Sequence, residues 1–342
     1  MTGAESRILR EIREAPEALL RQELSLAAPV AELAARLKRR PPLLAVTCAR
    51  GSSAHAATFA KHLFERYLGI PVAAAAPVVA SVYRRELNLK DQLFLAISQS
   101  GRSDDLIETA AAAKRAGALT AAIVNASGSP LAAQCDLVLP MCAGPEESVA
   151  ATKTFVATLA ALLRLTAAWT GDAGLEAAIG RLPGRLAAAS DLDWSGAVSA
   201  LAGAPSLVAI GRGPTLAIAR EAALKLKETC NLHAEAFSGA EFLHGPVALV
   251  SPDYPILMFM PTDAAAEGMQ RLAADLRGKG AALFTSGAEM GGGVLPALAP
   301  DQPEADAVCL IQSFYSMIVR LADALGMDAG QPRHLHKVTR TV

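Results

Sequence analysis

The chain has 342 residues, with 32 Lys and Arg against 33 Asp and Glu, and 52% of its residues are hydrophobic. This length accommodates roughly two domains of ~150 residues each. Because charges of both signs are interspersed along the sequence and the net charge is -1, we expect no binding of nucleic acid or of an anionic membrane. The mean hydropathy of +0.31 is high, but no stretch reaches the about 18 uninterrupted apolar residues of a membrane-spanning helix.

The N-terminal 22 residues carry charges every few positions and contain no apolar signal-peptide core, so we expect a cytoplasmic protein. The five cysteines are an odd number without a Cys-x-x-Cys pair. We expect them to be reduced and mostly buried thiols: Cys48, Cys135, Cys142, Cys230 and Cys309.

Residues 1–42 are predicted to form a helical lead-in, because apolar residues recur there at near-helical spacing between charges. After Pro41 and Pro42 the pattern changes to short β-type runs that alternate with longer Ala-rich amphipathic runs. Strands are predicted at 43–49, 71–76, 93–98, 119–124 and 137–141, and helices at 53–68, 103–116 and 149–169. Such alternation predicts an α/β fold with a parallel sheet that helices cover on both faces.

The second half of the sequence repeats this pattern. Gly51 and Gly213 align at an offset of 162 residues (213 minus 51), and the offset continues without a gap, so that Asp91 lies over Asp253. We therefore predict two tandem doubly wound parallel-sheet units of flavodoxin-like type. The expected boundaries are 43–172 for the first domain and 196–330 for the second, with a helical connector at 173–195 and a C-terminal tail at 331–342.

The segment Ser98–Ser103, with the sequence SQSGRS, directly follows a predicted strand and precedes a predicted helix. A helix N-terminus there would present free N–H groups and a partial positive charge, while serine hydroxyls and a glycine allow close contact with phosphate oxygens. Ser52 and Ser53 follow the adjacent strand. The second copy has Met260–Asp263 at this position, whose acid would repel phosphate, so only the first copy is predicted to bind it. The alternative is a serine-rich helix cap without a ligand.

A second polar segment lies on the predicted helix that follows Gly213. Glu221, Lys225 and Glu228 are spaced i, i+4, i+7 and so share one helix face, where they form either a solvated salt-bridged surface or an acid/base centre. Two histidines and two glutamates then fall within twelve residues: His233, Glu235, Glu241 and His244. Their spacing matches no zinc motif, so no metal is predicted. The basic tail 331–337 is, by its composition alone, typical of a solubilising chain end.

Five motifs occur here in the order of one family: SQSG at 98–101, GPExxVAxTK at 144–153, ALKLKE at 223–228, HAEAxxxxExxHGP at 233–246 and QPRxLxK at 331–337. Over residues 40–342 the chain resembles the proteins with two sugar isomerase (SIS) domains. It looks like the isomerase half of glutamine-dependent glucosamine-6-phosphate synthase and like its stand-alone deaminase relatives.

The resemblance implies a role for each matching residue. It assigns sugar-phosphate binding to Ser53, Ser98, Gln99, Ser100 and Ser103, and pocket positions to Glu146 and Val149. It makes Glu228 the shuttle that moves a proton between C1 and C2, and gives His244 a role in ring opening from the partner subunit of a homodimer. The tail residue Lys337 would reach the carbonyl end of the substrate. No cofactor is implied.

The sequence departs from the synthase in three ways. It has about 40 residues before the first predicted strand instead of a glutaminase domain, Arg102 replaces an acid, and Ala151 replaces a serine. These departures favour a cofactor-independent deaminase that converts glucosamine 6-phosphate to fructose 6-phosphate and ammonia. The alternatives are another phosphosugar aldose-ketose isomerase, a fructosamine-phosphate deglycase, or a non-catalytic sugar-phosphate sensor. A dehydrogenase is disfavoured, because Gly211 and Gly213 lack the third glycine of the dinucleotide motif.

Overall fold

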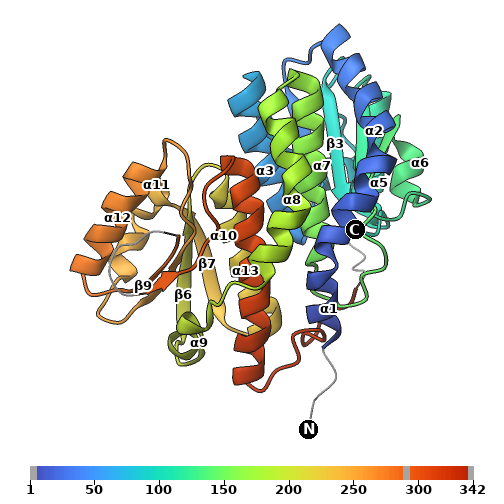
Figure 1. Ribbon diagram of the computed structural model, residues 1–342. Helices are drawn as coiled ribbons and strands as arrows, with labels where there is room; N and C mark the ends of the chain where they lie inside the picture. Colours follow the sequence, from blue (N-terminus) through green and yellow to red (C-terminus); the bar gives the residue numbers. More distant parts are fainter. Residues whose placement is uncertain (1–5, 288–292, 338–342) are drawn as a thin grey trace. The chain divides into compact units, whose positions relative to one another are not determined.

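The computed structural model describes residues 6–287 and 293–337. By their internal contacts these residues belong to two compact units, each built on one sheet (Figure 1). The first-sheet unit comprises Glu17–Glu146, Lys153–Gly180 and the chain from His336. The second-sheet unit comprises the chain to Pro16, Glu147–Thr152 and Arg181–Leu335.

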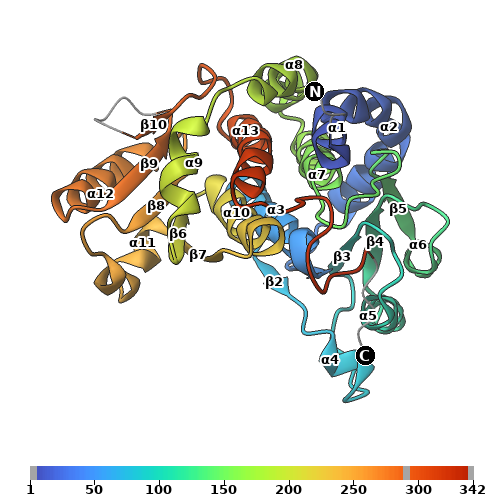
Figure 2. The same cartoon turned by 90° about the horizontal axis from the view of Figure 1, so that it is seen from below.

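The first-sheet unit holds five parallel strands in the order β2-β1-β3-β4-β5. The sheet is formed by β1 (Ala45–Ala49), β2 (Val72–Ala74), β3 (Leu93–Ser98), β4 (Leu119–Val124) and β5 (Leu137–Pro140). Helices cover both faces, with α3 and α7 on one and α5 and α6 on the other (Figure 2). The helices of this part of the chain are α2 (Ala15–Arg39), α3 (Gly51–Leu68), α4 (Val78–Ser81), α5 (Asp104–Arg115), α6 (Pro130–Gln134) and α7 (Lys153–Thr170).

The second-sheet unit repeats this strand order as β7-β6-β8-β9-β10, again all parallel. Its strands are β6 (Ser206–Gly211), β7 (His233–Ser238), β8 (Pro255–Met258), β9 (Ala282–Ser286) and β10 (Val294–Leu295). Its helices include α1 (Arg7–Arg13), α9 (Ser195–Ala202), α10 (Thr215–Cys230), α11 (Gly239–Phe242), the 3-10 helix η1 (Pro246–Leu249), α12 (Ala266–Gly278) and α13 (Pro303–Ala324). The helix α8 (Ala173–Ser190) begins in the first-sheet unit and ends in the second-sheet unit.

The repeat extends to the backbone of the turns. Asp91 and Asp253, which share the 162-residue offset, have φ of 65° and 63° just before β3 and β8. Gly69 and Asn231 end α3 and α10 in the same left-handed conformation. The predicted α/β class and the internal repeat are therefore confirmed. The domain limits given above remain a prediction.

One predicted helix begins later than expected. Residues 149–152 are not helical, and α7 starts at Lys153. The reason is that the preceding backbone is engaged elsewhere: within the second-sheet unit, the Val149 N–H donates to the Gly330 carbonyl oxygen at 3.2 Å. Backbone groups held by another segment cannot enter the helical ladder.

The most apolar helix is a core element. Among the described residues α13 alone is long and apolar enough to cross a bilayer, but 89% of its apolar window is buried. It packs against α1, α9 and α10 of its own unit. This burial is typical of the central helix of a folded unit.

The five thiols are free, and four are buried. Burial is the largest cause that raises the pKa of Cys48, Cys135 and Cys309 to about 12 and that of Cys230 to about 11. Cys142 is only half-buried, which departs from the expectation for this residue.

Thiol labelling tests this distribution. In the native protein at pH 8, we expect one thiol to react rapidly with Ellman's reagent, because the thiolate is the reactive form and four thiols are buried with raised pKa values. All five should react in denaturant. The control variant Cys142→Ser should lose the rapid phase, and rapid labelling that persisted in it would contradict the assignment.

Gly211, the last residue of β6, has no room for a side chain. A Cβ atom there would stand 2.2 Å from the Thr215 carbonyl oxygen in the first turn of α10. We expect Gly211→Ala to destabilise the protein by about 1–3 kcal/mol or more, because the backbone of the helix must shift. Thermal unfolding measures the effect.

Gly180→Ala is the matched control. Gly180 lies inside α8 with nothing within 4 Å of a Cβ atom, so the substitution should stabilise by about 0.4–1 kcal/mol. Equal melting temperatures for the two variants would contradict the close approach of β6 and α10.

Candidate functional site

The predicted phosphate-binding residues lie at one edge of the first sheet. The strand order reverses direction between β1 and β3, which are hydrogen-bonded neighbours. Ser53 stands in the first turn of α3, directly after β1, and Ser98–Ser103 connects β3 to α5. Carboxyl ends of adjacent strands at such a switch point form the usual ligand crevice of doubly wound sheets.

The loop between β3 and α5 is held in a fixed shape by its own polar groups. The buried Ser98 hydroxyl accepts the Gly101 N–H at 3.1 Å, and the Ser100 hydroxyl accepts the Arg102 N–H at 3.4 Å. The Asn125 N–H donates to the Gln99 carbonyl oxygen at 3.2 Å. These contacts orient the loop without a ligand, which lowers the entropy lost on binding.

Gly101 is a strict requirement of this loop. Its φ is +62°, and a Cβ atom there would stand 2.0 Å from the Ser129 hydroxyl oxygen. Ser103 is the N-cap residue of α5, yet its hydroxyl caps no backbone N–H among the described residues. Ser103 and the N-terminal N–H groups of α5 lie at the same end of the helix, where an anion is favoured.

Sequence reasoning missed an ion pair beside this loop. Arg50, the N-cap residue of α3, donates through Nε at 3.1 Å and Nη2 at 2.6 Å to Oδ2 of Asp105. The two residues are 55 positions apart, so no helical or strand spacing could have connected them. Only the placement of α3 and α5 beside neighbouring strands brings them together.

The second-sheet unit contains a buried charge cluster on α10. Lys225 is 1% exposed and its ammonium group contacts Glu228 and, at 3.3 Å, Oε1 of Glu221. The Tyr315 hydroxyl of α13 donates to the same Glu221 oxygen at 3.1 Å. The three charged residues therefore do not form a solvated face, and only Glu228, with 20% of its side chain exposed, reaches solvent. Tyr315 carried no recognisable signal in the sequence.

The cluster keeps Lys225 charged. Burial opposes the charge and is the largest single influence, but Glu221 and Glu228 together outweigh it and raise the pKa of Lys225 above its ordinary value of 10.5. A raised pKa contributes stability that is fully present below pH 10.5 and is lost only as the pH rises through the raised pKa.

His244 lies outside α10, the helix that carries this cluster. It is exposed, between α11 and Gly245, whose φ is +138°. His233 and Glu235 are exposed on β7, an edge strand of the second sheet. No group of three or more His, Cys, Asp or Glu that could hold a metal ion occurs in the part of the chain that the structure describes.

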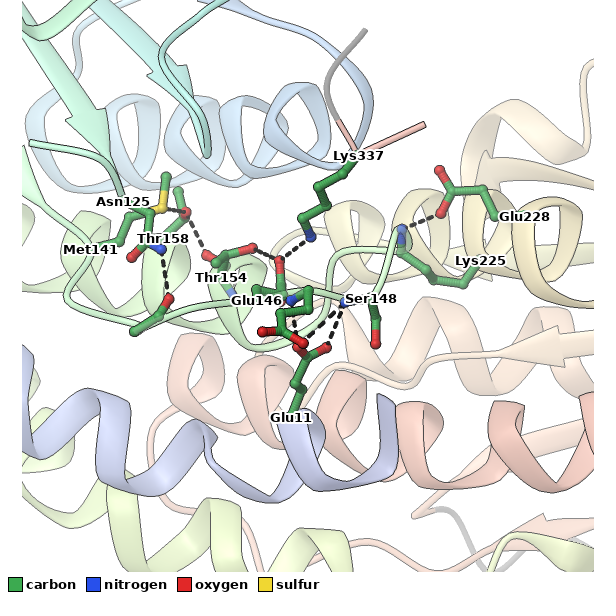
Figure 3. A network of polar contacts seen from close by, with 12 residues as sticks. Glu11, Asn125, Met141, Glu146, Ser148, Thr154, Thr158, Lys225, Glu228 and Lys337 are labelled. Carbon is green, nitrogen blue, oxygen red and sulfur yellow. Dashed lines mark hydrogen bonds and ion pairs between the residues drawn. The ribbon is translucent and has the colours of Figure 1, made fainter. Parts of the chain in front are cut away.

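Figure 3 shows the polar contacts of Glu146 and Lys337, which belong to the first-sheet unit, and those of Glu11, which belongs to the second-sheet unit. In the first-sheet unit, Lys337 donates to Oε2 of the buried Glu146 at 3.1 Å, and Thr154 donates to both Glu146 oxygens. In the second-sheet unit, the buried Glu11 of α1 accepts the N–H groups of Glu147 and Ser148. Glu11 therefore holds the backbone that leads to Val149. The sequence did not single out Glu11 or Thr154.

The structure thus groups the predicted residues within each unit. Five of them share the switch-point edge of the first sheet: Ser53, Ser98, Gln99, Ser100 and Ser103. Glu146 and Lys337 form an ion pair in that unit. The second-sheet unit carries Glu228, His244 and Val149. Of the two replaced residues among the three departures, Arg102 is exposed and Ala151 is half-buried.

The charge cluster generates a stability prediction. Lys225→Met should destabilise the protein by about 3–5 kcal/mol, because it leaves two carboxylates, one of them fully buried, without their cation. Denaturant unfolding at pH 7 measures the loss. Lys227→Met is the control: this lysine of the same helix is exposed and donates to the backbone carbonyl of Ala234 at 3.0 Å, and its loss should cost less than about 1 kcal/mol. Equal stability of both variants would refute the cluster.

Comparison with known proteins gives the family. The SIS domain family model matches residues 45–168 and 200–285. The glutamine–fructose-6-phosphate aminotransferase (isomerizing) of Halobacterium salinarum is 34% identical over 98% of this chain and 59% of its own length. The chain spans about half the length of the curated relatives that it matches.

Two solved structures are similar over nearly the whole chain. A Silicibacter pomeroyi protein, provisionally assigned as a phosphosugar isomerase, is 45% identical with a TM-score of 0.91, over 95% of this chain and 100% of its own. The C-terminal domain of the glucosamine-fructose-6-phosphate aminotransferase of Francisella tularensis is 25% identical with a TM-score of 0.82, over 96% and 99%. Because the family model matches more than half of the sequence and both sheets have the expected order, the chain belongs to the SIS domain family.

Proposed function

We propose that the protein is a cofactor-independent phosphosugar enzyme that converts glucosamine 6-phosphate and water to fructose 6-phosphate and ammonia. The observation that carries the proposal is Glu228. It is the one member of the α10 charge cluster whose carboxylate reaches solvent, and the buried Lys225 fixes its position. A carboxylate held in this way is suited to moving a proton between two carbon atoms of a bound sugar.

The phosphate group is assigned to the first-sheet edge. Ser53, Ser98, Gln99, Ser100 and Ser103 supply hydroxyl, amide and backbone N–H donors there, next to the N-termini of α3 and α5. Anchoring the phosphate fixes the sugar against the reacting groups, and such positioning supplies a large part of the rate of a reaction without a cofactor.

The reaction follows from these assignments. His244 assists the opening of the sugar ring to the free aldehyde. Glu228 removes the proton from C2 and returns it at C1, while a second proton passes from the amino nitrogen to the aldehyde oxygen. The C1 aldehyde thereby becomes an alcohol and C2 becomes a ketimine. Water adds to the ketimine carbon and ammonia leaves, which gives the ketose. Glu146 orients Lys337, which contacts the carbonyl end of the substrate. Val149 lines the pocket that holds the substrate.

The same proposal includes the assembly and location of the protein. His244 is exposed and lies between Leu243 and Leu249, which are 52% and 51% exposed. Exposed apolar side chains beside a functional residue are typical of a subunit interface, so we propose a homodimer in which His244 serves the partner's site. Free thiols fit a reducing compartment such as the cytoplasm.

A second candidate is plain aldose-ketose isomerisation of a phosphosugar. The transfer of a proton between C1 and C2 needs the same Glu228, and the 45% identical Silicibacter pomeroyi protein bears a phosphosugar isomerase assignment. This activity would release no ammonia from any substrate.

The deciding experiment measures ammonia and fructose 6-phosphate together after glucosamine 6-phosphate is added to the purified protein. Matched formation of both supports deamination. Interconversion of phosphosugars without ammonia supports the second candidate. Absence of turnover with tight binding would reject the deamination and point to another phosphosugar substrate or to a sensor.

Glu228→Gln tests the proton shuttle. We expect kcat to fall by about 10²–10⁴-fold with binding of fructose 6-phosphate retained, because the amide cannot accept the C2 proton. Glu235→Gln is the control: Glu235 is an exposed glutamate on β7 of the same unit, and this variant should keep its activity. Wild-type turnover by Glu228→Gln would reject Glu228 as the shuttle.

A further inference from the structure

The ion pair between Arg50 and Asp105 occupies a sensitive position in the first-sheet unit. Arg50 is the last residue before α3, and Asp105 is the second residue of α5. These are the two helices whose N-termini border the switch-point edge. The Asp105 side chain is 1% exposed, whereas that of Arg50 is 52% exposed. A full negative charge is therefore buried in the first turn of the helix that is assigned to phosphate.

Such a carboxylate should work against anion binding. The N-terminus of a helix attracts anions through its partial positive charge. A carboxylate in the first turn interacts with that same partial charge and so partly neutralises it. Oδ1 of Asp105 already accepts the Leu106 N–H at 2.9 Å. Since Asp105 is buried, water screens its charge poorly, and a phosphate group nearby would experience its repulsion.

The second copy of the fold shows that this pair is not a general requirement of the repeat. At the 162-residue offset, Arg50 corresponds to Arg212 and Asp105 to Glu267, which is again the second residue of its helix, α12. There the acid pairs with Arg271 four residues further along its own helix, and the two side chains are 79% and 69% exposed. Of these two equivalent places in the repeat, only the one in the copy with the serine loop has a buried acid whose ion pair links two helix N-termini.

We propose that Arg50 is a charge-compensating positioning residue of the phosphate site. By donating two N–H groups to Oδ2 of Asp105, it neutralises the buried carboxylate, so that the N-terminus of α5 and the serine hydroxyls can hold a phosphate dianion. Asp105 in turn anchors the half-exposed guanidinium. This inference rests on the phosphate site of the proposed function, but it concerns binding and needs no turnover.

The test is a double-mutant cycle on binding. Dissociation constants for inorganic phosphate and for fructose 6-phosphate are measured by calorimetry at one ionic strength for the wild type, Arg50→Ala, Asp105→Asn and the double variant. We expect Arg50→Ala to weaken binding by about 10-fold or more, since it leaves an unpaired buried charge. Asp105→Asn should bind as well as the wild type or more tightly. The double variant should return to within about threefold of the wild type.

Two other patterns would overturn the inference. If the pair acts only as a mechanical link between the two loops, all three variants will weaken binding alike. If Arg50 contacts the phosphate directly, Arg50→Ala and the double variant will weaken it alike, while Asp105→Asn will not. Failure of the wild type to bind either probe would also overturn it. Binding by the wild type without release of ammonia from glucosamine 6-phosphate would reject the proposed deamination and leave this inference standing.

Three controls keep the result interpretable. Thermal unfolding of each variant checks that it is folded. If Arg50→Ala is not folded, the double variant, which lacks the unpaired carboxylate, still measures the affinity of the site without the pair. Arg50→Lys retains the positive charge and should recover part of the lost affinity. Asp104→Asn changes the neighbouring acid, which is exposed, and should leave the affinity within about twofold. In turnover of an active substrate, Arg50→Ala should raise KM and leave kcat near its wild-type value.

Discussion

Parallel pairing of the strands is the constraint on which the rest of this protein depends. When all strands of a sheet run in one direction, their carboxyl ends, and the helix N-termini that follow, must lie along one edge. Ser53 and the start of the serine loop at Ser98 are 45 positions apart (98 minus 53), yet they share one sheet edge because β1 and β3 are neighbours. The same rule operates on the second sheet, where β6 and β8 are neighbours. There a different sequence, with Met260 and Pro261 where the first copy has Ser98 and Gln99, gives a loop whose hydroxyl, that of Thr262, donates to Asp306 at 2.7 Å.

Each unit also buries an acid-base pair, and the two pairs solve the same physical problem. An isolated charge in the interior is very costly, so a buried charge must be paired and hydrogen-bonded. In the second-sheet unit a buried cation, Lys225, is surrounded by two carboxylates. In the first-sheet unit a buried anion, Asp105, is met by a guanidinium that reaches in from solvent. In both cases one partner remains accessible: Glu228, which is proposed as the proton shuttle, and Arg50, which is proposed as a positioning residue.

The sequence was sufficient for the fold because the periodicity of its strands and helices and the 162-residue repeat are local or regular signals. It was also sufficient to find Ser98–Ser103 and the α10 stripe, whose residues are adjacent or share a helix face. It could not decide whether Lys225 faces solvent, since a helical stripe has the same spacing when buried. Arg50 with Asp105, Glu221 with Tyr315, and Glu11 with Ser148 join distant segments. No single-sequence pattern encodes such contacts, which arise only from the tertiary packing.

The burial of Lys225 has a consequence for chemical modification of the protein. Acylating reagents attack the neutral amine, and this ammonium group is 1% exposed between two carboxylates that keep it protonated. Lys225 is therefore shielded from acetylation and from amine-directed cross-linkers in the native state, although it lies on the same helix as the exposed Lys227. The ratio of labelling at these two lysines would report, from within a mixture or a cell extract, the fraction of molecules in which the core of the second-sheet unit is intact.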